Sequence, residues 1–267
     1  MSTIEDVRAA ATPRAVAYRL VAGIVAVVFL GLWLFEGYFV VTAWFPELYD
    51  ELTPINGVAA GAFMTLMLLC ALAALILPRR AIGPARVLFV GAGTLAVLLP
   101  LALVPGDPLV GTGLLVAGVA IVVTLAVLHP AREVAFDRRD LTPVWPAVAL
   151  ALVIAGPAVV LGVELQYSQL TLDDEIAQRW FYGGLSMYLL VTALLAGVAS
   201  VDGRTRPTTG GAASLLAGLL GLVSIRFPGE LHSFGRLGGA LLVGWALAMV
   251  AVVVLVGRDG VAGAESE

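Results

Sequence analysis

One carboxylate lies inside the first long apolar stretch of the chain, where a charged side chain is energetically unfavourable. Glu36 falls near the far end of the stretch from Ala15 to Phe45, among aromatic residues that include Trp33 and Tyr38. About 20 apolar residues cross a bilayer, so this stretch can cross one with residues to spare. An ionisable side chain at such a depth is costly and usually faces other protein or a water-filled cavity. We therefore expect Glu36 to point into the protein, towards a basic partner or water.

Further polar residues are predicted at the same end of the molecule as Glu36, at the ends of later apolar stretches or in the loops between them. Together with Glu36 they are Asn56, Glu164, Tyr167, Arg179, Arg226, Glu230, His232 and Arg236, accompanied by Trp180 and Tyr182. Such a set can line an outward-facing vestibule that binds a small charged solute or relays a proton. It can equally form ion pairs that fix the helix packing, with Glu36 held by one of the three arginines. The sequence leaves both interpretations open.

The chain lacks the side chains that several other chemistries require. No lysine occurs, which excludes a Schiff base, and the single cysteine, Cys70, excludes an intramolecular disulfide. The two histidines are His129 and His232, and there is no phosphate-binding glycine loop, HExxH motif or nucleophile elbow. We therefore predict no catalytic residue, no cofactor and no metal site. The sequence carries no positive sign of an enzyme.

The composition predicts an all-α integral membrane protein. Of the 267 residues, 60% are hydrophobic and 13% are charged, whereas soluble domains carry about 25% charged residues. The net charge of −4 and the absence of a basic run exclude nucleic acid as a partner and leave the lipid bilayer, other membrane subunits or a second copy of the chain. All 15 basic residues are arginine, which favours a prokaryotic source with a GC-rich genome.

The apolar stretches predict a bundle of eight transmembrane helices between a polar leader, 1–14, and a polar tail, 257–267. The predicted spans are 16–44, 54–77, 86–104, 109–128, 143–164, 179–200, 208–226 and 237–256. The seventh is the weakest, because 210–225 supplies only 16 residues before Arg226, and several of them are glycine. The fifth contains Gly156-Pro157 near its middle, and proline removes a helical hydrogen bond. We expect a bend there that faces other helices or water.

The distribution of arginine predicts the orientation in the membrane. With eight spans both termini lie on one side, and twelve arginines fall on that side against three on the other. Arginine and lysine accumulate on the cytoplasmic side of membrane proteins. The sequence therefore predicts a protein of the cell membrane with both termini in the cytoplasm.

The two halves of the chain show a faint internal similarity. A shift of 123 residues places Asp50 on Asp173, Gly61 on Gly184 and Met64 on Met187, with spans one to four over spans five to eight. Because each half holds an even number of spans, the halves would form a parallel repeat, four plus four.

Two functions of different classes fit these features. The first is a small transporter, or permease-like protein, which Glu36, the proline in span five and the internal similarity favour. The second is a non-catalytic accessory or assembly subunit of a larger membrane complex, which the short loops and the lack of catalytic residues favour. The surroundings of Glu36 separate the two: a continuous polar cavity indicates transport, and closure by a single arginine indicates a structural role.

Overall fold

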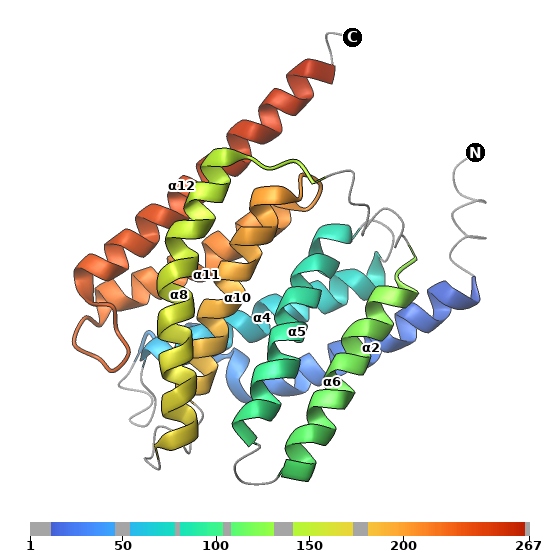
Figure 1. Cartoon of the computed structure of the whole chain (residues 1–267), viewed down its shortest axis with the longest axis horizontal. Coiled ribbons are helices and arrows are strands. Elements are labelled where there is room, and N and C mark those ends of the chain that lie inside the picture. Colours follow the sequence, from blue (N-terminus) through green and yellow to red (C-terminus); the bar gives the residue numbers. More distant parts are fainter. Residues whose placement is uncertain are drawn as a thin grey trace.

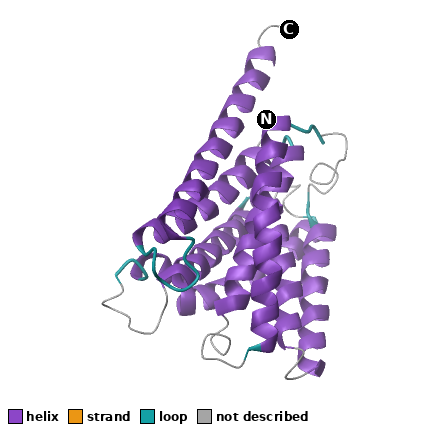
Figure 2. Ribbon diagram, turned by 60° about the vertical axis from the view of Figure 1, so that its left-hand side comes forward, coloured by secondary structure: helices purple, strands orange, loops and turns teal. Residues whose placement is uncertain are grey.

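The computed structural model describes residues 12–45, 54–77, 81–103, 108–130, 141–172 and 181–264. Within these ranges it leaves undescribed the side chains of residues 35, 36, 99–103, 108, 110, 111 and 257–264. The named elements of the described chain are all helices, and they form one bundle (Figures 1 and 2). The predicted all-α fold is therefore confirmed.

Within the described residues, eight long helices make up the bundle. They are α2 (Pro13–Leu32), α4 (Pro54–Ile76), α5 (Ile82–Leu103), α6 (Pro108–Leu128), α8 (Trp145–Thr171), α10 (Phe181–Val201), α11 (Arg206–Arg226) and α12 (Gly235–Ala264). The first is followed by a π-helical turn, η1 (Trp33–Gly37), and a short helix, α3 (Phe39–Thr42). Proline occupies the first turn of several of these helices, where its missing N–H costs nothing.

Six of these helices are long and apolar enough to cross a membrane, namely α2, α4, α8, α10, α11 and α12. The described parts of α5 and α6 contribute shorter apolar segments, Ile82–Leu98 and Thr112–Leu128. The protein therefore has the character of a multi-pass membrane protein, whereas the predicted count of eight spans is not confirmed.

Two helices extend beyond the predicted spans. The seventh span was predicted at 208–226, and α11 begins at Arg206 and has 21 residues. The fifth span was predicted to end at Glu164, and α8 continues to Thr171. The added residues include Gln166 and Gln169, and glutamine is compatible with helix. The helix also continues through Pro157, so the bend stays a prediction.

Four helices form the centre of the bundle and four lie outside them. The central helices include α10, α11 and α4, whose spans are 67%, 61% and 50% buried, while the spans of α2, α8 and α12 are only 33%, 22% and 22% buried. In a membrane the outer helices therefore present most of their surface to lipid.

The packing of the first four long helices matches that of the last four. In the first half α2 packs on α4, α4 on α5 and α5 on α6, and α6 also contacts α2. In the second half α8 packs on α10, α10 on α11 and α11 on α12, and α12 also contacts α8. The halves join where α4 and α5 meet α10 and α11 (Figure 1). Residues on these four central helices can therefore belong to a site shared by both halves.

Candidate functional site

Three polar or aromatic side chains from both halves meet at one end of the bundle, here called the distal end. Asn56 Nδ2 lies 3.1 Å from His232 Nδ1, and the His232 ring packs edge-on against Tyr182, with ring centroids 5.1 Å apart. Asn56 is buried, with 5% of its surface exposed. We call Asn56, Tyr182 and His232 the distal cluster.

Each member of the distal cluster is held by a different element. Asn56 lies in the first turn of α4, just after Pro54, and Tyr182 lies in the first turn of α10. His232 lies in the loop between α11 and α12, with a backbone φ of 64°, a conformation that is uncommon outside glycine but that histidine, asparagine and aspartate adopt more often than other residues. The cluster is therefore the place where the start of α4 in the first half contacts α10 and a loop of the second half.

Hydrogen bonds fix the shape of the loop that carries His232. Ser233 Oγ donates to the Ser224 carbonyl over 3.3 Å, and the Phe234 N–H donates to Ser224 Oγ over 3.4 Å. Ser224 itself is fully buried near the end of α11. The position of the imidazole is therefore set by the end of α11 and does not depend on the contact with Asn56 alone.

The contact with Asn56 relates the orientation of the amide to the tautomer of the imidazole. When the Asn56 Nδ2–H group donates, His232 Nδ1 accepts and the ring proton lies on Nε2. A proton on both ring nitrogens would place two donors face to face and would require the amide to turn.

The other predicted vestibule residues do not join this cluster in the part of the chain that the structure describes. Glu164, Tyr167, Arg226, Glu230 and Arg236 are all exposed. The Arg226 guanidinium lies over the Phe227 ring, 5.0 Å from its centroid. Arg179 and the side chain of Glu36 lie outside the described residues, so the predicted pairing of Glu36 with an arginine stays a prediction. Of the nine predicted residues, the structure brings Asn56 and His232 together.

The backbone around Glu36 has an unusual conformation and lies close to α4. Residues Trp33–Gly37 form the π-helical turn η1, and such turns occur frequently at functional sites. A Cβ atom at Gly61 of α4 would collide with the backbone of Val40, just after this turn. Trp33 also donates from Nε1 to Thr65 Oγ1 over 3.0 Å. The interrupted end of the first span is thus fixed tightly against α4, the helix that carries Asn56 in its first turn.

Two glutamines on α8 were missed in the sequence. Gln169 Oε1 accepts a 3.0 Å hydrogen bond from the Gly183 N–H at the start of α10. Both polar atoms of the Gln166 amide are buried and make no hydrogen bond with the described residues. A buried amide without a partner costs about 1–3 kcal/mol. Two amides three residues apart, directly after an apolar stretch, are a signal that could have identified them.

A second polar network lies at the opposite end of the bundle, here called the N-terminal end because α2 begins there. Arg14 donates to the carbonyls of Val127 and His129, at 2.6 and 3.2 Å, and thereby caps the end of α6. Arg206 donates from Nε to the Ala199 carbonyl over 2.9 Å and from its terminal nitrogen to the Thr142 carbonyl over 2.6 Å. Arginine is well suited to such helix ends because it donates in several directions and complements the helix dipole.

An ion pair completes this network. Arg86 on α5 lies 3.3 Å from Asp202, and the other carboxylate oxygen of Asp202 accepts from the Arg204 and Thr205 N–H groups at 3.2 and 3.3 Å. The Asp202 carboxylate therefore connects the turn before α11 to the start of α5. Sequence reasoning used these arginines only to count charge and missed their contacts. Their hydrogen bonds all hold helix ends, which indicates a structural role.

Neither end of the bundle offers a metal site in the described chain. No group of three histidine, cysteine, aspartate or glutamate side chains comes together among the described residues. The distal cluster presents hydrogen-bonding groups and an imidazole. The chain matches no protein-family model, no curated protein and no solved structure.

Proposed function

We propose that the protein is a small permease-like transporter whose solute site is the distal cluster. The observation that carries this proposal is the contact between Asn56 of the first half and His232 and Tyr182 of the second half. A buried amide, an imidazole and a phenol together bind small polar or charged solutes through hydrogen bonds. A change in the separation of the two halves would open or close this contact.

The relation between the halves supports the proposal. The matched packing of the two sets of four helices is what a parallel four-plus-four repeat would produce, with all eight long helices crossing the membrane. Transporters commonly consist of such repeats, and their substrates bind at the interface between them. The distal cluster lies at that interface.

The interrupted first helix is a second support. Transporter sites commonly use helices that are broken near the solute. In this chain α2 gives way to the π-helical turn with Glu36 and then to α3, and this segment packs on α4. Glu36 is our candidate for an additional charged group on the path of the solute or of a proton.

The proposed orientation follows from the arginines. In the predicted eight-span topology, twelve of the 15 fall on the side of the termini. With the positive side in the cytoplasm, the N-terminal end is internal and the distal cluster faces outward. We propose the cell membrane as the site of the protein.

A binding screen tests this function. Purified protein in detergent is heated with a panel of amino acids, mono- and dicarboxylates, sugars and organic cations, and its melting temperature is recorded. A solute that binds the folded state raises the melting temperature. We expect one class to do so, and we expect uptake of a radiolabelled member of that class into proteoliposomes.

The variants in this screen are chosen to remove chemistry and keep the fold. His232→Asn removes the imidazole but tolerates the positive φ, and Tyr182→Phe keeps the ring that packs on His232. Both should abolish the shift and the uptake. Glu164→Gln, an exposed position on α8, is the matched control and should retain both. Stabilisation that persists in His232→Asn would place the site elsewhere and contradict the proposal.

An accessory role in a larger complex is the alternative, and the N-terminal network favours it. Arg14 and Arg206 donate to backbone carbonyls at or next to the ends of helices, as residues with a structural role do. An accessory subunit would show no solute response and would co-purify with partner subunits after mild solubilisation. A transporter would respond to solute as an isolated chain.

A further inference from the structure

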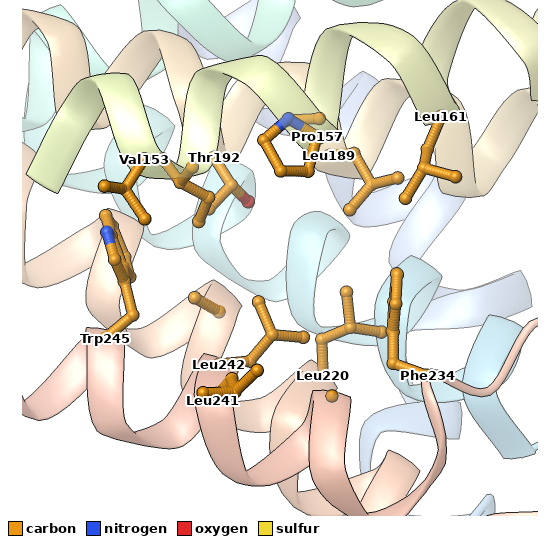
Figure 3. A pocket seen from close by; sticks show the side chains of 14 residues that line it. Val153, Pro157, Leu161, Leu189, Thr192, Leu220, Phe234, Leu241, Leu242 and Trp245 are labelled. Atoms are coloured by element: carbon orange, nitrogen blue, oxygen red, sulfur yellow. The ribbon is translucent and has the colours of Figure 1, made fainter.

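The second half of the bundle contains an apolar cavity that opens to the side. The cavity has a volume of about 270 Å³ and is lined by 14 residues from α8, α10, α11, α12 and the loop before α12 (Figure 3). Figure 3 shows Pro157 and Leu161 of α8 facing Trp245 and Leu242 of α12 across the open space. We call this space the lateral crevice.

The lateral crevice opens on the surface that faces lipid. Val153 of α8 and Leu241 of α12 both line it, and they are 65% and 66% exposed. Deeper in the crevice, Ala158, Ala217 and Leu220 are at most 2% exposed. Because α8 and α12 are outer helices that each span the membrane, the mouth between them is at the hydrocarbon and not at water.

The crevice extends from Phe234, just before α12, to mid-depth in the membrane. Pro157 is next to the middle of α8, which runs from Trp145 to Thr171. Trp245 is at the middle of the span formed by Gly235–Val256. A molecule that enters from the side at this depth must therefore be hydrocarbon, because water-soluble solutes do not reach it.

The polar groups of the crevice already have partners inside the protein. Thr192 is the one lining residue with a hydroxyl, and it donates to the Tyr188 carbonyl over 2.8 Å. Trp245 donates from Nε1 to the Leu150 carbonyl over 2.8 Å. The walls therefore select an apolar occupant that offers no hydrogen bonds.

The size of the crevice selects among apolar occupants. A transmembrane helix of a partner is about 10–12 Å across with its side chains, so it could cover the mouth but not fill the interior. A volume of about 270 Å³ lies just under the usual range of small-molecule pockets, roughly 300–1,000 Å³, and suits a segment of one chain. Filling it restores the van der Waals contacts that an empty space loses.

We propose that the lateral crevice holds one acyl chain of a membrane lipid, inserted between α8 and α12 against Trp245. The chain acts as a spacer between two outer helices that touch each other only lightly. This site is separate from the distal cluster, and its occupancy does not depend on transport.

Tryptophan quenching tests the proposal in the full-length protein. Replacing Trp33, Trp44, Trp145 and Trp180 with phenylalanine leaves Trp245 as the single fluorophore. The protein is reconstituted in phosphatidylcholine vesicles whose acyl chains carry bromine at mid-chain, a contact quencher of indole. Trp245 is only 8% exposed, so lipid that stays outside the crevice hardly reaches it. We expect strong quenching.

Filling the crevice provides the matched comparison. Ala158→Leu and Ala217→Leu place larger side chains in its interior, whereas Ala149→Leu adds the same atoms to the exposed face of α8. We expect most of the quenching to be lost in the two filled variants and retained in Ala149→Leu. Equal quenching in all three would overturn the proposal.

A reference on the lipid face gives a result even if the filled variants fail to fold. Leu247 is 66% exposed on α12 and does not line the crevice. Leu247→Trp, combined with Trp245→Phe, therefore reports contact with bulk lipid. An acyl chain in the crevice predicts quenching of Trp245 comparable to that of this reference. Protection of Trp245 while the reference is quenched would mean that the crevice is closed or covered by protein, and the proposal would fail.

Discussion

His129 lies fully buried at the N-terminal end, between two aromatic rings and near two arginines. Its ring centroid lies 5.1 Å from that of Tyr18 and 6.4 Å from that of Phe89. Burial, followed by the positive charges of Arg14 and Arg86, lowers the pKa of His129 to about 4. The folded protein therefore keeps this imidazole neutral at a pH where an unfolded chain would protonate it.

This difference predicts a loss of stability in acid. The unfolded histidine takes up a proton as the pH falls below about 6.5, whereas the folded one does so only near pH 4, so the contribution is complete above 6.5 and declines between these values. Each pH unit below 6.5 lowers the free energy of unfolding by about 1.4 kcal/mol, so about 2 kcal/mol is lost by pH 5. Thermal melting in detergent at pH 7.5 and at pH 5 measures this loss of stability.

The His129→Gln variant isolates this contribution. Any other group that takes up a proton in acid acts in the variant as well as in the parent protein. The parent should therefore lose more stability than His129→Gln over the same pH interval. Identical pH dependence of the parent and His129→Gln would show that His129 is not held neutral by the fold.

The distal cluster shows how far single residues are predictable. Their places at the ends of apolar stretches predict that Asn56 and His232 lie at one end of the bundle. Their contact depends on a loop with φ of 64° at His232 and on a serine 8 residues earlier in α11, and no periodicity encodes such a loop. The cap formed by Arg14 was equally hidden, because its acceptor is a backbone carbonyl 113 residues away.

At the scale of the elements, the closest approach involves the segment after η1 and α4. A Cβ atom at Gly61 would collide with the backbone of Val40 and would lie 3.0 Å from the Gly37 carbonyl oxygen. Backbone atoms cannot rotate away as a side chain can. The glycine is therefore required for the interrupted first helix to reach α4.

Alanine substitutions at two glycines distinguish the cost of a close contact from the effect of alanine on helix propensity. Gly61→Ala should lower the melting temperature, with a cost of about 1–3 kcal/mol for overpacking. Gly184→Ala is the matched control, because a Cβ atom there meets nothing within 4 Å. It should be neutral or slightly stabilising, since alanine favours helix over glycine by about 1 kcal/mol. Equal melting temperatures for the two variants would contradict the close contact.

The helices themselves were predictable, but their ends were less so. Long apolar runs bounded by proline and arginine predict each of the eight long helices, because the composition leaves no alternative in a membrane. The extension of α8 to Thr171 depends on Gln169, whose side chain bonds to the start of α10. Tertiary contacts of this kind set helix ends, and the sequence does not display them.

At the scale of the whole molecule, the two halves pack alike although their sequences share little. The glycine contacts differ between them: Gly61 meets backbone, while Gly184, its partner under the 123-residue shift, faces open space. The resemblance thus lies in the order of helix contacts and not in particular residues. The same order of helix contacts needs few sequence matches, because one apolar residue can replace another at lipid-facing and interhelical positions.

The proposed function requires that the distal cluster joins the two halves and faces outward. Cross-linking between positions 56 and 232 tests both parts at once. In a Cys70→Ala background, Asn56→Cys and His232→Cys are combined, and intact cells are treated with a short bifunctional thiol reagent that does not cross membranes. Asn56→Cys combined with Ser200→Cys, at the opposite end of α10, is the control pair.

We expect an efficient intramolecular cross-link between positions 56 and 232 in intact cells and none in the control pair. Absence of that cross-link, with both thiols reactive after solubilisation, would contradict the shared cluster. A cross-link that forms only after the membrane is opened would place the cluster in the cytoplasm and overturn the outward-facing site.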